Sequence, residues 1–381
     1  MNGPALRCDV AIVGGSLAGS AAAAALARAG ADVLVVEKAR FPRPKICGEF
    51  LSYEAIPVLE RLGALEAVRE AGPETIERFA VVRPDGRALA SRLAAPVLSL
   101  SRERLDAIVS RAAENAGARV RFGSPVVSLD GGLARGFTLE GPDLAVASRV
   151  VIGAWGRYAP LDGRLGRPFF KTPAALFGFK KHLSGESAHL AGRAVLHVFD
   201  GGYLGLSRVE GGIVNLAALA TPALAKEAHH DFDELLARLC ERSPALASDL
   251  EGLAAEAGPV LLSEPVHLGA HGAVVKDVLL VGDAAGVLDP YTGAGMATAL
   301  TTGEAAAPAV LAFLAGGISA RELAARHART HRALTGARFF WSRAFRPFFG
   351  GGLASRLVLP AASPFAALAA RLTRGAPARS V

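Results

Sequence analysis

Two glycine-rich segments, widely separated in the chain, contain residue types that bind the phosphates and hydroxyls of a nucleotide. The first spans residues 14–19, with the sequence Gly-Gly-Ser-Leu-Ala-Gly, and follows an apolar run. Gly14 permits a tight turn, Gly19 lets a helix approach a strand, and the helix N-terminus faces a pyrophosphate. Ser16 replaces the middle glycine of the usual G-x-G-x-x-G pattern, and Ala18 lies in the same turn.

An acidic residue follows the next apolar run. Glu37 lies about 20 residues beyond the first glycines, where a carboxylate accepts hydrogen bonds from a ribose diol. Such a carboxylate would repel a 2′-phosphate. Lys38, next to it, is included among the expected cofactor-binding residues.

The second segment runs from Leu279 to Met296 and distinguishes FAD from NAD. A strand that ends in Gly282 and Asp283 presents a carboxylate to the hydroxyls of a ribityl chain, which NAD lacks. The loop after it leads into a second helix, whose N-terminal amides suit the negative charge of a reduced flavin. The loop residues expected to contact the flavin are Pro290, Gly293, Ala294, Gly295 and Met296.

The elements that must position these segments alternate between strands and helices. Residues 9–13 and 31–36 have the pattern of buried strands, and the Ala-rich residues 20–29 that of a helix between them, which is a parallel βαβ unit. Strands are expected in 76–100, 119–122, 125–152, 167–222 and 277–281, and helices in 53–68, 103–116, 228–256 and from about 295. These elements predict an α/β fold, in which a β-sheet domain is inserted into a Rossmann-like FAD-binding domain.

The expected boundaries make the FAD-binding domain discontinuous. It consists of residues 1–75, 101–165 and 266–315. The substrate-binding sheet domain consists of residues 76–100 and 166–265. Residues 316–381 form a C-terminal helical segment that is rich in arginine and aromatic residues.

With both glycine-rich segments, the chain resembles flavoproteins of the p-hydroxybenzoate hydroxylase fold, the group A flavoprotein monooxygenase superfamily, over roughly residues 8–315. It is most similar to their geranylgeranyl-reductase-like branch. In that resemblance Arg102 corresponds to an arginine along the linker of the flavin. Residues 44–52 resemble the K-x-C-G-E segment beside the isoalloxazine, which adds Lys45, Cys47 and Gly48 to the expected cofactor site. The strand-rich middle of the chain corresponds to the substrate roof over the flavin.

One departure from the family concerns the electron donor. Hydroxylases of this fold carry an Asp-Gly pair where this chain has Trp155 and Gly156. Because tryptophan cannot supply the carboxylate that helps to bind flavin and nicotinamide there, NADH or NADPH is one candidate donor, and a separate reductase or carrier is the alternative.

Two interpretations of Cys47 stay open. In the first it is a catalytic thiol near the flavin, which donates a proton or positions the substrate, with Lys45 favouring its thiolate. In the second it is a small buried residue that packs against the ring. Cys8 and Cys240 are expected to be packing residues, and the pair His229–His230 lacks a third ligand, so no metal site is expected.

Charge separates the body of the chain from its tail. The net charge is +7, and ten arginines follow Glu322 with no Asp, Glu or Lys among them, which leaves 7 − 10 = −3 for the first 322 residues. The tail either caps the fold through its aromatic residues, with its arginines in water, or binds an anionic membrane surface or an acyl carrier protein. Nucleic acid is not an expected partner. Without a signal peptide, zinc spacing or disulfide pattern, the expected location is the cytoplasm, with the membrane periphery as an alternative.

Three functions follow from these residues. The leading hypothesis is an FAD-dependent monooxygenase that acts on a bulky apolar substrate, aromatic or polyketide-like. The alternative is a flavin-dependent reductase of carbon–carbon double bonds in isoprenoid substrates, which the segment from Lys45 to Glu49 and the missing Asp-Gly carboxylate favour. A non-catalytic carrier of lipid or prenylated protein is the third, although a carrier would not need both halves of an FAD site. A halogenase is less expected, because the chain lacks a W-x-W-x-I-P motif.

Overall fold

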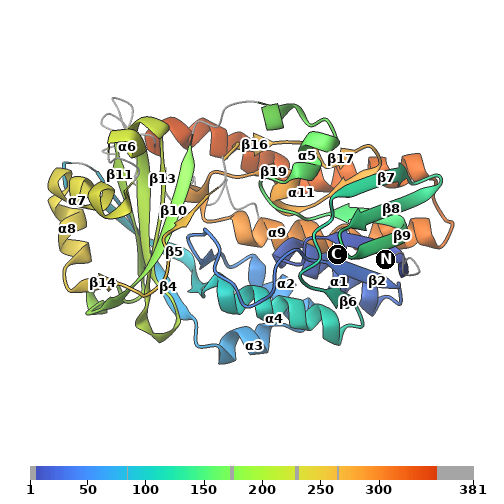
Figure 1. The fold of residues 1–381 in the computed structure, drawn as a ribbon. Coiled ribbons are helices and arrows are strands. Elements are labelled where there is room, and N and C mark those ends of the chain that lie inside the picture. Colours follow the sequence, from blue (N-terminus) through green and yellow to red (C-terminus); the bar gives the residue numbers. More distant parts are fainter. Residues whose placement is uncertain (1–5, 84, 172–175, 228–230, 264–265, 350–381) are drawn as a thin grey trace.

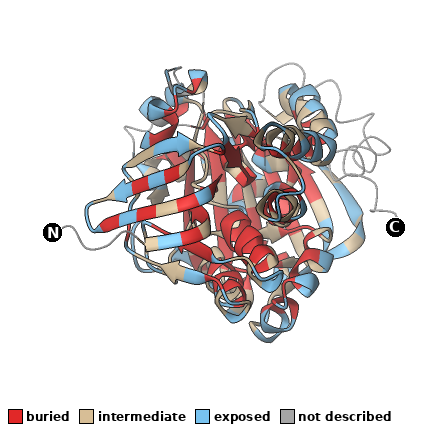
Figure 2. Cartoon of the chain, turned by 90° about the vertical axis from the view of Figure 1, so that its right-hand side faces the viewer, coloured by how far each residue is buried: buried red, intermediate tan, exposed pale blue. Residues whose placement is uncertain are grey.

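The fold is a computed structural model that describes residues 6–349, apart from residues 84, 172–175, 228–230 and 264–265. Two large sheets divide the described chain (Figure 1). The first sheet and its helices lie to the right in that view, and the second sheet, with a smaller group of helices, lies to the left. Buried residues form the interior of both halves (Figure 2).

The first sheet has the strand order β17-β18-β9-β1-β2-β6. Its strands are β1 (Leu6–Val13), β2 (Val33–Val36), β6 (Arg119–Arg121), β9 (Leu144–Gly153), β17 (Val274–Val275) and β18 (Val278–Leu280). All neighbours from β18 to β6 are parallel, and the hairpin of β7 (Ser128–Gly132) and β8 (Gly136–Gly141) is added along β9. Apolar residues fill these central strands because both faces of a parallel sheet are covered.

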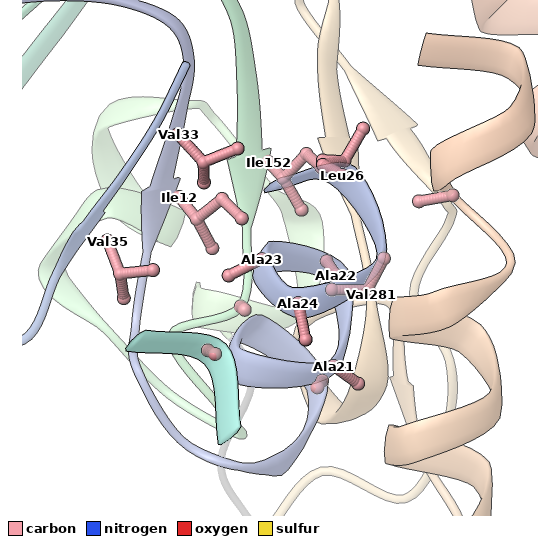
Figure 3. Close-up of a cluster of buried hydrophobic side chains, with 14 of the residues drawn as sticks. Ile12, Ala21, Ala22, Ala23, Ala24, Leu26, Val33, Val35, Ile152 and Val281 are labelled. Carbon is pink, nitrogen blue, oxygen red and sulfur yellow. The ribbon is translucent and has the colours of Figure 1, made fainter. Parts of the chain in front are cut away.

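Helix α1 (Leu17–Arg28) packs against this sheet with a face of alanines (Figure 3). Small residues are required there, because a Cβ atom on Gly19 would lie 1.8 Å from the carbonyl oxygen of Gly14. Helix α9 (Gly295–Glu304) is equally close to α1, since a Cβ atom on Gly303 would lie 2.1 Å from the oxygen of Ala18. The two helices that follow the two glycine-rich segments are therefore direct neighbours.

The second sheet has the order β14-β10-β13-β12-β11-β4-β5-β3, with β15 added along β10. Its strands are β3 (Phe50–Leu51), β4 (Glu74–Val82), β5 (Ala88–Ser99), β10 (Phe177–Gly185), β11 (Arg193–Phe199), β12 (Gly202–Arg208), β13 (Val214–Ala220), β14 (Leu253–Ala255) and β15 (Leu261–Leu262). Its outer face packs against α7 (Phe232–Arg242) and α8 (Pro244–Leu250), next to α6 (Pro222–Glu227). Its inner face is turned toward residues 47 and 48 of the first half of the molecule, which accept hydrogen bonds from β13 and β12.

Several elements differ from the sequence prediction. The expected helix 53–68 is two helices, α2 (Ala55–Arg61) and α3 (Leu65–Glu70), because Gly63 adopts a φ of 66° between them. Strand β3 pairs with β5 and so joins the second sheet. Helix α4 (Arg102–Asn115) and α5 (Pro160–Arg164) flank the first sheet, and α10 (Ala307–Leu314) follows α9. Residues 295–314 have the length and composition of a membrane span, but 44% of that stretch is buried in this fold.

The C-terminal helix α11 (Ala320–Phe349) buries a polar face. The expectation that its arginines would stay in water is wrong for the buried Arg338, whereas Arg326, Arg329, Arg332 and Arg343 are exposed. Its aromatic residues cover the fold in part, since Phe349 stacks on Tyr291. After Leu323 in the sequence, the buried residues of the helix are His327, His331, Thr335, Arg338 and Ser342. Phe340 is 65% exposed, and its neighbour Trp341 is half-buried. The other expected tail residues, 350–381, lie outside the described part of the chain.

Candidate functional site

The first glycine-rich turn has the geometry that the sequence predicts. Gly14 adopts a φ of 106°, and a Cβ atom there would lie 2.4 Å from the oxygen of Ala154 at the end of β9. Glu37 follows β2 and is buried beside the turn. Its carboxylate accepts hydrogen bonds from Gly15 N at 2.8 Å and Ala39 N at 2.9 Å. Lys38 is exposed beyond it.

A cluster of charged residues adjoins the turn. Asp106 on α4 is fully buried and pairs with Lys45 at 2.6 Å and with Arg102 at 2.9 Å. The Arg102 guanidinium also donates to Ser16 Oγ at 2.8 Å. Ser101 caps α4 by accepting from Arg104 N, which fixes the start of the helix and thus Arg102. The cluster therefore joins the glycine-rich turn, the Lys45–Gly48 segment and α4.

Burial and ion pairing shift the pKa values of the groups in this cluster in opposite directions. Burial would raise the pKa of Asp106, but the cations of Arg102 and Lys45 outweigh it and lower that pKa. Burial would lower the pKa of Arg102, but the Asp106 carboxylate and the Cys47 thiol raise it. For Lys45 burial prevails over Asp106 and lowers the pKa to about 8. Lys45 is thus the cation of the cluster whose charge depends on pH near neutrality.

The second glycine-rich segment meets the first one here. A Cβ atom on Gly282 would lie 2.8 Å from the Cβ of Ala18 on α1. Asp283 is half-buried, and the charges of Arg157, Arg102 and Lys45 act on its carboxylate. Burial nevertheless raises the pKa of Asp283, and those three cations only reduce the rise. Gly14 and Asp283 therefore belong to one site.

The loop after Asp283 leads to the N-terminus of α9. Gly293 takes a φ of 63°, and a Cβ atom there would lie 2.8 Å from the ring of Phe50. Ala294 and Met296 are buried, whereas Gly295, the first residue of α9, is exposed, as is Pro290 earlier in the loop. The loop is thus anchored by its apolar residues and open at the helix start.

The Lys45–Gly48 segment lies beneath the inner face of the second sheet. Asn215 on β13 donates to the Cys47 carbonyl at 3.1 Å, and Ser207 on β12 donates to the Gly48 carbonyl at 3.5 Å. The thiol of Cys47 interacts with Arg102. The structure therefore positions Cys47 between the predicted roof and the charged cluster.

Trp155 has a structural role that the sequence does not reveal. Its ring covers Gly153, where a Cβ atom would lie 2.3 Å from the indole. Its Nε1 donates to Asp162 at 3.1 Å, and Asp162 also pairs with Arg167 at 2.7 Å. The residue in place of the family carboxylate thus holds α5 against β9.

Sequence reasoning missed other polar residues of the site. Asp106 is four positions after Arg102 on a predicted helix, and that spacing is a signal of an ion pair. Glu49 belongs to the quoted K-x-C-G-E segment but received no role. Tyr203 on β12 donates to Asp289 at 2.6 Å, and Arg346 on α11 pairs with the same carboxylate at 3.0 Å. No sequence pattern connects these last three residues.

The residues present fit an FAD molecule. Gly48, Gly156 and Gly295 border space, because no protein atom lies within 4 Å of where a Cβ atom would be. The residues suit an extended dinucleotide: Glu37 would accept from a ribose, Ser16 and Arg102 would bind the diphosphate, and Asp283 would accept from ribityl hydroxyls. The exposed start of α9 would face the pyrimidine end of the flavin.

This combination of a parallel glycine-turn sheet, a second sheet over it and a Gly-Asp segment defines a flavoprotein of the p-hydroxybenzoate hydroxylase fold. The FAD binding domain family matches residues 7–181. Menaquinone reductase of Mycobacterium tuberculosis is 31% identical over 317 residues, covering 78% of this chain and 75% of that protein. Digeranylgeranylglycerophospholipid reductase 1 of Methanopyrus kandleri is 32% identical over 339 residues, covering 79% and 80%.

Among solved structures, the flavin-dependent brominase Bmp2 superposes with a TM-score of 0.77 at 20% identity, over 96% of this chain and 94% of that one. PqsL of P. aeruginosa superposes with a TM-score of 0.73 at 20% identity, over 90% and 97%. These likenesses show the fold. The chain belongs to the family of FAD-dependent oxidoreductases that includes the two reductases. The predicted fold class, cofactor and enzyme class are confirmed.

Proposed function

We propose that this enzyme reduces carbon–carbon double bonds in a prenyl chain. The observation that carries the proposal is the position of Cys47, between the roof sheet and Arg102, beside the open space at Gly48. Two relatives that match over more than three quarters of this chain at 31% and 32% identity have names that specify prenylated substrates, a menaquinone and a digeranylgeranyl lipid. The alternative hypothesis from the sequence thus becomes the preferred one.

The reaction needs a hydride at one carbon and a proton at the other. Bound, reduced FAD supplies the hydride. We assign the proton to the Cys47 thiol, whose neighbour Gly48 borders open space. Arg102 beside the sulfur stabilises the negative charge that remains after transfer.

The inner face of the roof suits an apolar chain. In the middle row across the sheet, Ala217 on β13 lies opposite Gly205 on β12, between Lys180 on β10 and Leu196 on β11. The next row is apolar, with Leu219 opposite Tyr203. A prenyl chain laid along Ala217 and Gly205 would contact small residues and lie next to apolar side chains.

Anaerobic turnover is the direct test. Enzyme reduced with dithionite and given a menaquinone or a digeranylgeranyl lipid should yield product heavier by two hydrogens per bond, measured by mass spectrometry. Cys47→Ala should lower the rate at least tenfold while FAD content stays the same. Product that forms only with oxygen would refute the proposal.

A monooxygenase is the second candidate. It is supported by 6-methylpretetramide 4-monooxygenase of Streptomyces rimosus, which is 33% identical over 176 residues, or 42% of this chain. Oxygen uptake equal to the amount of product formed would favour this function over double-bond reduction.

The electron donor and the tail complete the proposal. NADH, NADPH or a separate reductase would reduce the flavin, and reduction by each nicotinamide can be followed through loss of flavin absorbance. We place the enzyme in the cytoplasm at an anionic membrane surface, where prenyl substrates reside, with Arg343 and exposed Phe340 at the end of α11 facing the lipid. Binding to vesicles with and without anionic lipid tests this, and an acyl carrier protein is the other proposed partner.

A further inference from the structure

Glu49 is a buried carboxylate with a partner on every side. Its Oε1 accepts from Lys180 Nζ and, at 2.7 Å, from the backbone N–H of Arg102. Its Oε2 accepts from His182 Nε2 at 2.7 Å. Glu49 has no exposed surface, and Lys180 is almost completely buried. Burial would raise the pKa of Glu49, but the hydrogen bond from His182 and the charge of Lys180 lower it, so the group is anionic.

The backbone of Glu49 reverses the chain directly after Cys47. Its φ of 55° lies in the left-handed region, which is unfavourable for a residue with a Cβ atom. The Glu49 N–H donates to Cys47 Sγ at 3.4 Å. The Glu49 carbonyl accepts from Ser99 Oγ at 3.0 Å at the end of β5. The backbone conformation is therefore maintained from both the side chain and the carbonyl.

These contacts connect the roof to the thiol. Lys180 and His182 point inward from β10, the strand next to β13. Asn215 of β13 donates to the Cys47 carbonyl, so the roof binds this turn both at Cys47 and at the Glu49 side chain. On the opposite side, the Arg102 N–H fixes the start of α4, and the Arg102 side chain reaches the sulfur.

We propose that Glu49 is a positioning residue, which holds the Cys47 thiol toward the reacting groups and links its orientation to the roof sheet through Lys180 and His182. Cys47 needs such support, because no hydrogen bond joins its sulfur to the roof strands among the residues that the structure describes. The catalytic consequence rests on the proposed function, whereas the effect on the thiol itself does not.

A charge-balanced double variant tests the proposal. Glu49→Gln with Lys180→Met removes one charge of each sign, keeps the volume similar and leaves no buried ion unpaired. The matched control is Asp249→Asn with Arg193→Met, which removes another carboxylate–cation pair with a neighbouring histidine, on the outer face of the same sheet. The rate at which iodoacetamide labels Cys47, measured on its peptide by mass spectrometry, requires no substrate.

We expect the Glu49/Lys180 variant to label Cys47 at least threefold more slowly, because the donors to the sulfur are no longer aligned. Its kcat for double-bond reduction should fall about tenfold, with KM and FAD content within twofold of wild type. The Asp249/Arg193 variant should match wild type in all four quantities. Equal labelling rates in the three proteins, or equal losses in both variants, would overturn the proposal.

Two outcomes separate this inference from the proposed function. If the wild type reduces no prenyl double bond, the proposed function fails, but the labelling rates still test the positioning. If the Glu49/Lys180 variant does not fold, His182→Gln replaces it, since His182 is 21% exposed and its loss leaves the Lys180 pair intact. That variant should slow labelling of Cys47 at least twofold, and an unchanged rate would refute the role of Glu49.

Discussion

The two faces of the second sheet carry the same group of side chains in different surroundings. On the inner face, Glu49 is paired with Lys180 and His182. On the outer face, Asp249 of α8 is paired with Arg193 at 2.5 Å and His197 at 3.0 Å, both from β11. Burial opposes ionisation of both carboxylates, and a histidine hydrogen bond with a nearby cation lowers both pKa values.

The surroundings differ in what else each carboxylate contacts. Asp249 connects one helix to one strand, and its side chain is 13% exposed. Glu49 is fully buried, adopts a left-handed backbone conformation and contacts both α4 and the Cys47 turn. A carboxylate, a cation and a histidine therefore connect two elements on the outer face, whereas on the inner face the same three groups support a reactive thiol. The chemistry of the three side chains alone does not distinguish them.

The largest expected difference is in stability. Glu49→Ala leaves Lys180 buried without a counter-charge, so the free energy of unfolding should fall by about 3–5 kcal/mol. Asp249→Ala leaves Arg193, whose side chain is 32% exposed, with access to water, and it leaves the neutral form available to the buried His197, so it should cost about 1–2 kcal/mol. Urea unfolding followed by circular dichroism measures both. Equal losses of unfolding free energy in the two variants would mean that both carboxylates have the same structural role.

A third carboxylate, Asp283, should affect the cofactor and not the sheet. Loss of a charged hydrogen-bond acceptor costs about 1.5–3 kcal/mol, so Asp283→Ala should weaken FAD binding about 10–100-fold. Asp249→Ala should leave FAD affinity unchanged. Fluorescence titration of apoprotein with FAD gives both dissociation constants. Full retention of flavin by the Asp283 variant would show that this carboxylate does not hold the ribityl chain.

Acid should reveal the lowered pKa values. A carboxylate whose pKa is lower in the folded protein stabilises it above the unfolded value of about 4, and that contribution is lost as pH falls through the folded value. Wild-type stability should thus fall below about pH 4, and it should fall less steeply in the Glu49/Lys180 variant, by about 1–2 kcal/mol over that range. Denaturation midpoints measured from pH 5 to 3 test this, and parallel curves would contradict it.

Lys45 gives the smallest expected effect. Because burial lowers its pKa to about 8, its charge is present at pH 7 and is lost as pH rises through about 8. FAD affinity should therefore fall a fewfold, roughly 0.5–1 kcal/mol, between pH 7 and 9. Lys45→Met should bind FAD with a pH-independent constant over that range. Neither the Glu49 pair nor the Asp249 pair should alter this dependence.

Local patterns in the sequence were sufficient for the cofactor half. Gly14, Glu37 and Asp283 each stand at the end of a strand whose apolar pattern is unmistakable, and parallel strands bring such ends to one edge. The partners of Glu49 could not be inferred in the same way. Lys180 is 131 residues away from Glu49 in the sequence, and their pairing depends on the register of β10. A shift of one residue in that register would turn Lys180 to the outer face of the sheet.

The tail illustrates a different limit. Arginine and aromatic residues in α11 suggested an exposed charged face, yet Arg338 is buried and donates to Thr298 at 2.7 Å. Helical periodicity tells which residues share a face, but the face that is buried here is polar. Only the tertiary fold supplies its acceptors, such as the Leu280 carbonyl for His327 at 3.0 Å.

The dependence on α11 has a consequence for biosynthesis. Every proposed FAD-binding residue has been translated by Met296. The Leu280 carbonyl and the Asp289 N–H, however, bind His327 and Ser342, which lie near the end of the described chain. A nascent chain therefore emerges from the ribosome with its cofactor loop still lacking its final supports. Chains truncated after Ser319 should purify with little yellow colour, whereas full-length protein made in the same cells should retain it.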